Sequence, residues 1–415
     1  MAIDNKDKKV LKSSIEREQN EVACSAECEK IKGSKNLNVP HLRFPEFSGE
    51  WEEHTLSEYL EFKNGLNPDA KRIGSGLPFI SVMDILSEGV INYDNIRGKV
   101  NATEKEIECF GVKDGDLLFQ RSSETLEDVG RANVYMDNRT AIYGGFVIRG
   151  RKIGNYDPLF FKYLLATPLA RKRTCRMGAG AQHFNIGQEG LSKISLYFPS
   201  IEEQRKIAEF LSLIDERIAT QNKIIEDLKK LKSAITDLLF HSIADAHTIR
   251  LGEIAHITNG AGDVQDANTE HQEDWYPFFD RSEELKWFPT YSFDKEAVIY
   301  AGEGQSFYPR YYNGKFALHQ RCYAITDFAS CIIPKYCYHF MNTLNSYFVR
   351  NSVGSTVPSL RMDIFQKVEI RLPPIPKQQH ICKIIDAFYT KLEVEQRGIS
   401  ILQELKQFLL SQMFI

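Results

Sequence analysis

The chain contains one sequence pattern twice. Residues 56–65 (LSEYLEFKNG) recur as residues 251–260 (LGEIAHITNG), at an offset of 195. A second pair of segments starts at Pro199 and Pro373 and shares the pattern Pro-x-Ile-x-x-Gln-x-x-Ile, at an offset of 174. A repeat on this scale indicates a duplicated structural unit. The drop in offset places extra residues in the middle of the first copy.

Each copy closes on a stretch with the seven-residue periodicity of a coiled coil. The first stretch opens with Ser200 and Glu203 at capping-box spacing, and it holds no Gly or Pro up to Phe240. Both stretches turn polar at the same place, which favours two long antiparallel helices that pack on each other. The alternative is two helices that each pack on their own domain. The expected seam consists of Ile207, Phe210, Ile214, Leu228 and Leu231 in the first helix and Ile381, Ile384, Phe388, Leu402 and Leu405 in the second. A neighbouring row, which includes Leu211, Ile218, Ile225, Ile385 and Leu392, widens it.

The blocks before these helices show short apolar runs between Gly and Pro turns, which predict strands. The predicted strands are residues 78–82, 116–119, 145–148, 297–300 and 321–325. Asp157 followed by Pro158 predicts the start of a helix. The predicted fold class is α+β, with two tandem mixed α/β domains separated by two long antiparallel coiled-coil helices in a pseudo-twofold repeat. The predicted segments are a polar leader (1–40), a first domain (41–199), a central helix (200–246), a second domain (247–373) and a C-terminal helix (374–415).

The composition of the chain indicates where the protein acts in the cell and whether it holds disulfides or metals. The start of the chain lacks the apolar core of a signal peptide, and no apolar run is long enough to cross a bilayer. We therefore expect a cytoplasmic protein that makes no membrane contact. Eight cysteines in 415 residues are too sparse for a disulfide scaffold. Cys24 and Cys28 have no second ligand pair at metal-like spacing, so we expect no metal site.

The sequence shows no catalytic motif. It has no phosphate-binding Walker loop, no zinc-protease or nucleophile-elbow pattern and no dinucleotide fingerprint. Adenine methyltransferases use a short Asp/Asn-Pro-Pro-aromatic loop, and the nearest matches, at Asp157 and Leu372, are better explained as a helix cap and a strand-to-helix junction. We therefore expect no catalytic residue and no cofactor in this chain.

The charge is unevenly distributed. The formal net charge of −4 and the isoelectric point near 6.2 are unlike those of a general polyanion binder. Residues 149–176, however, hold eight Lys and Arg against one acid, Asp157. Lys and Arg supply most of the sequence-independent affinity for DNA, whereas polar side chains at base edges supply specificity.

Clusters of such side chains occur at corresponding places in both copies, so we interpret them as DNA contacts. The alternative for each cluster alone is a solvated surface patch. The candidates in the first domain are Lys63, Arg121, Ser122, Arg131, Arg171, Lys172, Arg173, Arg176, Gln182 and His183. Those in the second domain are Arg281, Arg310, Tyr311, Tyr312, His319, Gln320, Arg321, Arg350, Asn351 and Ser355.

Several motifs resemble those of a known family. Residues 42–51 (LRFPEFSGEW) lead into the first repeat, and both helices open with Pro-x-x-x-x-Gln, at Gln204 and Gln378. With the duplicated layout, this resembles the specificity subunit of type I restriction-modification systems over residues 40–415. The leader is longer than this family leads us to expect.

The resemblance implies two target recognition domains, each docking in the major groove on one half of a bipartite double-stranded DNA site. It implies that the long helices form the spacer and bind a modification subunit, in two copies. That partner would bring S-adenosylmethionine and adenine methylation, and a restriction subunit would bring ATP, Mg and DNA cleavage. Because the two domains differ in length and in every candidate residue, we expect an asymmetric, gapped target. The rival hypotheses are a self-sufficient DNA methyltransferase or nuclease and a coiled-coil scaffold that does not bind DNA.

Overall fold

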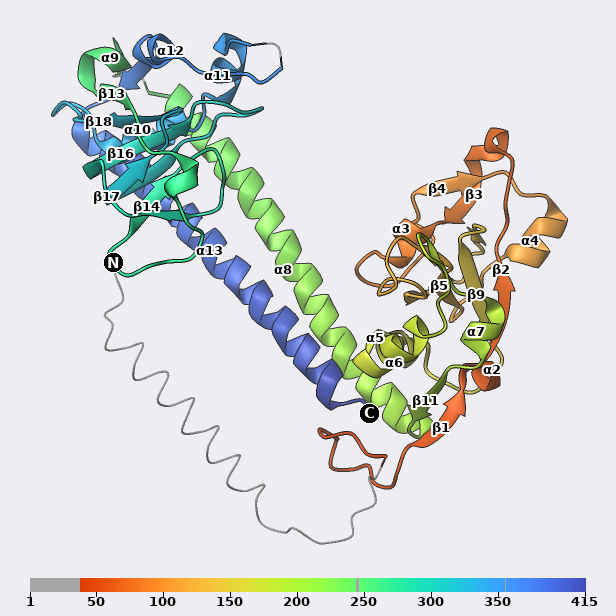
Figure 1. Ribbon diagram of the computed structural model, residues 1–415. Helices are drawn as coiled ribbons and strands as arrows, with labels where there is room; N and C mark the ends of the chain where they lie inside the picture. Colours follow the sequence, from red (N-terminus) through yellow and green to blue (C-terminus); the bar gives the residue numbers. More distant parts are fainter. Residues whose placement is uncertain (1–37, 244–245, 355) are drawn as a thin grey trace, which may run out of the picture. The chain divides into compact units, whose positions relative to one another are not determined.

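The computed structural model describes residues 38–243, 246–354 and 356–415 (Figure 1). Nearly all of the predicted leader, with Cys24 and Cys28, lies outside these residues, as does Ser355. The chain divides into two compact units. The first comprises the described residues up to Glu216 together with Gln403–Ile415, and the second comprises the described residues of Arg217–Leu402. Each long helix therefore contributes to both units.

The first unit combines small sheets with short helices. Its four-stranded sheet has the order β2-β9-β5-β7, and a three-stranded sheet has the order β4-β3-β8. The strands are β1 (Glu52–Thr55), β2 (Leu60–Asn64), β3 (Ile73–Ile80), β4 (Gly98–Val100), β5 (Leu117–Gln120), β6 (Ser122–Ser123), β7 (Ala132–Val134), β8 (Ile142–Tyr143), β9 (Val147–Lys152), β10 (Phe184–Asn185) and β11 (Ser195–Phe198). The helices are α2 (Leu56–Tyr59), η1 (Ala70–Arg72), α3 (Val82–Ile85), α4 (Glu104–Phe110), α5 (Pro158–Ala166), α6 (Pro168–Cys175), α7 (Gln188–Ser192) and the start of α8 (Ile201–His241).

The second unit is built around a six-stranded sheet with the order β13-β18-β16-β17-β14-β15. The strands are β12 (His247–Arg250), β13 (His256–Asn259), β14 (Tyr276–Phe279), β15 (Lys286–Phe288), β16 (Phe293–Ala301), β17 (Arg310–Leu318), β18 (Cys322–Thr326) and β19 (Glu369–Leu372). The helices are α9 (Leu251–Ile254), η2 (Val264–Asp266), α10 (Pro334–Met341), α11 (Asn345–Asn351), α12 (Met362–Gln366) and α13 (Ile375–Gln412).

The two units repeat one framework. In the first, β1 pairs antiparallel with β11, and in the second β12 pairs antiparallel with β19. Each of these ribbons joins the entry of a block to the strand that precedes a long helix. The short helices α2 and α9 follow the entry strands and lie in the repeated segments 56–65 and 251–260. The structure confirms the predicted fold class.

The C-terminal end of a long helix packs against the hydrophobic core of each unit. In the first unit the ring of Phe414, after α13, lies 6.1 Å from Trp51 and 5.4 Å from Phe160. In the second unit Phe240, near the end of α8, lies 5.6 Å from Tyr336 on α10. Phe240 and Phe414 make corresponding contacts, so the ends of both long helices also belong to the repeated structure.

The repeated glutamines explain the Pro-x-x-x-x-Gln motif. Gln204 accepts a hydrogen bond from the backbone N–H of Asp157 at 3.1 Å and donates to the carbonyl of Pro199 at 3.0 Å. Gln378 accepts from Ile333 N–H at 2.9 Å and donates to the carbonyl of Pro373 at 2.9 Å. Each glutamine is buried and ties the start of a long helix to the residue that precedes α5 or α10. Asp157 also caps α5, as predicted, by accepting from Phe160 N–H.

The predicted capping box at the start of α8 forms only in part. Glu203 N–H donates to Ser200 Oγ at 3.4 Å, but the Glu203 carboxylate forms an ion pair with Arg43 at 2.7 Å. Glu203 is nearly fully buried, so its negative charge is stabilised by this guanidinium. Arg43 belongs to the motif at residues 42–51, which is thereby fixed to α8.

The two long helices contact each other in each unit. In the second unit Gln221 donates to Glu395, and the ammonium of Lys232 lies 4.1 Å from the ring centre of Tyr389. In the first unit Lys406 pairs with Asp215 at 2.5 Å. The polar positions in the two predicted seams thus meet in an antiparallel arrangement.

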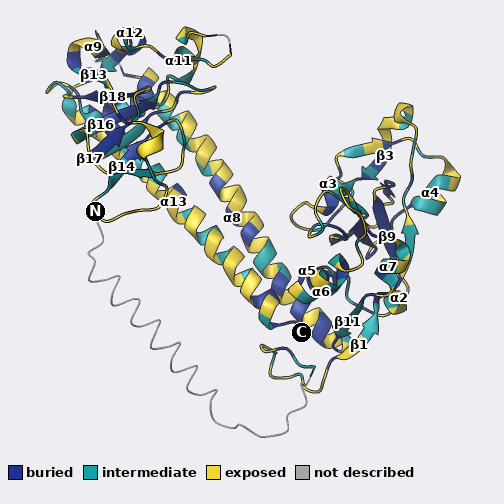
Figure 2. Ribbon diagram, viewed as in Figure 1, coloured by how far each residue is buried: buried dark blue, intermediate teal, exposed yellow. Residues whose placement is uncertain are grey.

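The seam itself differs from the prediction. Phe210, Leu231 and Leu405 are exposed, whereas the neighbouring row, with Leu211, Ile218, Ile225, Ile385 and Leu392, is buried. Both long helices show buried and exposed positions along their length (Figure 2). Ile207 and Ile381 are buried, and the predicted residues Ile214, Leu228, Ile384, Phe388 and Leu402 are half-buried. The apolar stripe is wider than one seam, and heptad assignment alone could not tell which edge faces the partner helix.

All five predicted strands overlap observed ones, namely β3, β5, β9, β16 and β18. Strand β9 extends to Lys152, beyond its predicted end at residue 148, although its second half is basic. Arg149 is buried and donates to the carbonyl of Gly111 at 2.9 Å, and Arg151 pairs with Asp116 at 3.0 Å. These internal partners let charged residues occupy a strand that apolar patterning cannot reveal.

Candidate nucleic-acid interface

The repeated Asn-Gly marks a close approach of two backbones. Gly65 N–H donates to the carbonyl of Val147 at 3.1 Å, and Gly260 N–H donates to that of Cys322 at 3.2 Å. A Cβ at Gly65 would overlap the carbonyl of Gly144, and one at Gly260 would overlap that of Leu318. Glycine is therefore required at both positions. It fixes the loops 144–146 and 319–321 at equivalent places in the two units.

A second chain segment crosses each of these loops. Arg121 N–H donates to the carbonyl of Phe146 at 2.8 Å, and Gly302 N–H donates to that of Arg321 at 2.9 Å. We define the first recognition loops as residues 121–122 and 144–146, and the second recognition loops as residues 302–303 and 319–321. The offset between equivalent residues is 195 at Gly65 and 175 at Val147. The extra residues of the first copy therefore lie between these two points, where β3, β4 and α4 are found.

Equivalent positions in the two sets of loops carry different side chains. Phe146, 68% exposed, corresponds to Arg321. Arg121 corresponds to Gly302, and Ser122 corresponds to Glu303. The same backbone framework thus presents an exposed aromatic ring in one unit and a charged pair in the other.

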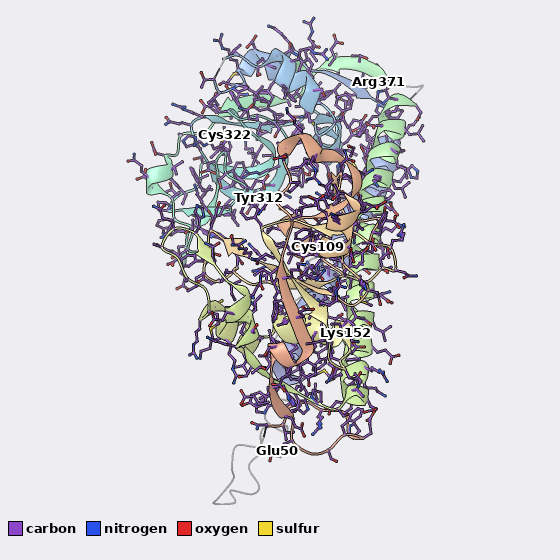
Figure 3. All side chains as sticks on the ribbon, turned by 90° about the vertical axis from the view of Figure 1, so that its right-hand side faces the viewer. Glu50, Cys109, Lys152, Tyr312, Cys322 and Arg371 are labelled. Atoms are coloured by element: carbon purple, nitrogen blue, oxygen red, sulfur yellow. The ribbon has the colours of Figure 1, made fainter. Side chains whose placement is uncertain are left out.

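The second recognition loops line a cavity of about 550 Å³. Four predicted DNA-contacting residues lie on it together: Arg281, His319, Gln320 and Arg321. Figure 3 labels Cys322, which also lines the cavity, and Tyr312 on the adjoining sheet. The structure therefore brings together residues from separate parts of the sequence, as a recognition site requires.

Ion pairs organise the wall of this cavity. Asp280 is nearly fully buried and pairs with Lys286 at 2.7 Å, and it also accepts from Ser282 N–H at 2.8 Å. Arg310 donates to the carbonyl of Ser282. Arg310 thus supports the cavity from outside and is not on its lining.

The other candidates in the second unit lie elsewhere. Tyr311 donates to Glu296, and burial raises the pKa of its hydroxyl. Tyr312 packs against Phe279, with ring centres 5.3 Å apart. Both tyrosines are half-buried. Arg350 and Asn351 are exposed at the end of α11 and do not line the cavity.

The first recognition loops hold two of the predicted residues. The Arg121 guanidinium donates to the carbonyl of Gly145 at 3.4 Å, and the Ser122 hydroxyl donates to Asn185. Sequence reasoning did not select Phe146, although it is the most exposed large apolar side chain here. An alignment of the two repeats could have found it, because Phe146 follows Gly144-Gly145 and these three residues align with His319-Gln320-Arg321.

The remaining candidates of the first unit are spread over three places. Gln182 and His183 are exposed on the turn closed by the bridge between Ala179 and Asn185. The Lys63 ammonium lies 2.9 Å from the Cys109 thiol. Arg131 pairs with Asp128 at 2.6 Å.

Much of the basic segment 149–176 serves the fold. Arg171 donates to the carbonyls of Glu127 and Val129, and Arg173 pairs with Glu53 at 2.8 Å. Lys172 and Arg176 are exposed. Arg131, Arg171 and Lys172 also line a cavity of about 460 Å³. Within the segment, Lys172 and Arg176 are therefore better placed than Arg171 and Arg173 to contact phosphates.

Among the described residues, no group of three or more His, Cys, Asp or Glu side chains could hold a metal ion. Over the same part of the chain, no helix is long and apolar enough to span a membrane.

Comparison with known proteins places this framework in a family. The family model described as type I restriction modification DNA specificity domain matches residues 48–230 and 244–407. The specificity subunit of the type I restriction enzyme EcoDI from Escherichia coli is 31% identical over 165 residues, which cover 40% of this chain and 36% of that protein. The MjaIX specificity subunit of Methanocaldococcus jannaschii is 21% identical, over 88% of this chain and 92% of its own.

The first four curated relatives are matched over less than half of their own length. Among solved structures, the S subunit of a type I restriction-modification system from M. genitalium has a similar fold. It gives a TM-score of 0.60 at 16% identity, over 91% of this chain and 99% of that one. The chain therefore belongs to the type I restriction-modification specificity family and carries two copies of the family's DNA specificity domain.

Proposed function

We propose that this chain is the DNA-recognition subunit of a type I restriction-modification complex and that its two units recognise two different half-sites. The observation that carries the proposal is the unlike chemistry of the equivalent recognition loops. Phe146 offers an apolar surface, whereas Arg321 offers hydrogen-bond donors. Apolar side chains contact the thymine methyl group, and arginine pairs with guanine, so one base pair cannot satisfy both loops equally.

The decisive experiment is to co-express the chain with a modification subunit that forms a complex with it and to map N6-methyladenine across the host genome. We expect a gapped, asymmetric sequence motif. A palindromic or ungapped motif would contradict the proposal, because two unlike sets of loops cannot favour identical half-sites.

Affinity independent of sequence would come from exposed basic side chains. Among the residues that the structure describes, the side chains of Lys172 and Arg176 make none of the internal contacts that hold Arg171 and Arg173. In the assembled complex, Lys172→Ala with Arg176→Ala should lower affinity for all sequences alike. It should also reduce the slope of log affinity against log salt by about 1 for each phosphate that the protein no longer neutralises. A changed motif would mean that these residues contact bases.

The long helices would bind the modification subunit through an exposed apolar stripe. On α8, Ile224, Leu231 and Leu238 recur at seven-residue spacing and are 38%, 49% and 65% exposed. On α13, Val394, Ile401 and Phe408 recur at the same spacing and are also exposed. Exposed apolar stripes of this kind mark protein interfaces. One stripe on each helix fits two copies of the partner.

This part of the proposal can be tested by mutating the stripe on α8. Replacing Ile224, Leu231 and Leu238 with Ser should abolish co-purification of the modification subunit. Replacing the exposed Lys229 with Ser on the same helix should not. Native mass spectrometry of the wild-type complex should give two modification subunits per chain, and a one-to-one complex would contradict the proposed copy number.

The chemistry would belong to the partners. We propose that S-adenosylmethionine binds the modification subunit and that ATP and Mg bind a restriction subunit. The purified chain alone should then transfer no methyl group to DNA in the presence of S-adenosylmethionine, whereas the complex with the modification subunit should. Methyl transfer by the chain alone would overturn this assignment.

A further inference from the structure

A charged pair stands at the rim of the cavity in the second unit. One terminal nitrogen of Arg321, Nη1, lies 2.8 Å from Glu303 Oε1 and 3.1 Å from Oε2. The Arg321 side chain is 65% exposed, and that of Glu303 is 24% exposed. The carboxylate therefore holds one edge of a guanidinium whose remaining surface faces solvent.

The backbone on both sides of this pair is fixed. Gly302 N–H donates to the carbonyl of Arg321 at 2.9 Å, and Gly304 N–H donates to that of Pro358 at 3.1 Å. Arg321 N–H donates to His319 Nδ1 at 3.2 Å. Arg321 and Glu303 are thus presented from two anchored segments, which reduces the rotamer freedom that binding would have to remove.

The free donors of Arg321 suit one class of DNA base. Within the described chain, Nε and Nη2 of Arg321 make no hydrogen bond. Guanine presents two acceptors, N7 and O6, at the major-groove edge, and arginine pairs with both. A phosphate is a poorer fit, because Glu303 would place a negative charge beside it.

The pair is not needed to hold the fold. At the equivalent places in the first unit, Phe146 and Ser122 occupy the same backbone framework, with equivalent hydrogen bonds. An exposed ion pair also contributes little to stability. A charged pair that the framework does not require is better explained by a ligand.

We propose that Arg321 recognises guanine in the half-site bound by the second unit and that Glu303 is its positioning residue. This inference rests on the proposed function. It goes beyond that function by naming the base and by giving a role to Glu303, which the sequence did not suggest.

The test uses the complex with the modification subunit and a duplex that carries its mapped site. Each guanine of the half-site is replaced in turn by 7-deazaguanine, which lacks the N7 acceptor. One replacement should weaken wild-type binding about tenfold. The same replacement should have no further effect on Arg321→Ala. In Glu303→Ala the ratio of the affinity for the guanine duplex to the affinity for the 7-deazaguanine duplex should fall. The thermal unfolding temperature of this variant should stay unchanged.

Arg250→Ala provides the matched control, because Arg250 is an exposed arginine of the same unit that lies on β12 and not on the cavity lining. It should retain the full effect of 7-deazaguanine. The inference is overturned if Arg321→Ala retains that effect or if the half-site contains no guanine, and the proposed function survives either result. If the wild-type complex shows no sequence-specific binding, the proposed function itself has failed.

Discussion

Gln378 offers a direct measure of how firmly a long helix is tied to its domain. Its side chain is fully buried and makes three hydrogen bonds, to Ile333 N–H and to the carbonyls of Cys331 and Pro373, at 2.8–2.9 Å. Gln378→Ala leaves all three backbone groups without a side-chain partner in the interior. Each unsatisfied buried group costs about 1–3 kcal/mol. Because water can enter the space left by the side chain, we expect a total loss of about 4 kcal/mol.

The size of the effect should follow the number of bonds. Gln204, the equivalent residue, makes two such bonds, so Gln204→Ala should cost about 2–3 kcal/mol. The assay is urea unfolding of the full chain, followed by circular dichroism. The urea concentration at the midpoint should fall, whereas the slope of the free energy of unfolding against urea concentration should stay constant.

The control is Gln379→Ala, which removes the same side chain from an exposed position on the same helix. Its effect should stay within about 0.5 kcal/mol. If Gln378→Ala destabilises the chain no more than this control, the repeated glutamines do not tie the helices to their domains, and the physical explanation of the Pro-x-x-x-x-Gln motif is wrong.

Three other sites in the structure give further predictions. Arg43→Ala should destabilise the chain by about 3–5 kcal/mol, because it leaves the buried Glu203 carboxylate unpaired, and Arg43→Met with Glu203→Leu should recover most of the loss in the same unfolding assay. Burial lowers the pKa of His339, and the nearby Lys335 and Lys232 act in the same direction, whereas Asp386, 2.9 Å away, opposes them. The unfolded chain therefore takes up a proton below about pH 6.5 before the folded chain does, and stability should fall as the pH drops. His339→Gln should remove that pH dependence, and His380→Gln, at an exposed site, should not. Phe146→Ala should lower DNA affinity about tenfold while the free energy of unfolding changes by less than about 0.5 kcal/mol, and an unchanged affinity would exclude a base contact by this ring.

The parts of the fold that repeat were predictable from the sequence. Gly65 and Gly260 recur because both approach a backbone carbonyl too closely for any side chain, and Gln204 and Gln378 recur because both bind the residue before a domain helix. Each of these requirements acts on a single position of the shared backbone framework, so the same residue type appears at the equivalent position of both copies.

The candidate site was less predictable, because the two copies carry different side chains at the equivalent loops. Listing Arg, Gln and His selected Arg321 and Gln320, which line the cavity, together with Arg171 and Arg173, which bond to their own domain. The sequence cannot show whether a guanidinium has an internal partner. Polar residues were favoured throughout, so Phe146 was missed.

The paired ribbons β1–β11 and β12–β19 also bear on how such a chain can change over time. Neighbouring strands lie about 4.8 Å apart, so each block leaves and rejoins the helical frame at almost one point. Insertions inside a block then need not move the helices, and the extra residues between β2 and β9 are an example. Each block is a chain segment that starts and ends at one paired ribbon, so its length and its side chains can vary without a change in the long helices.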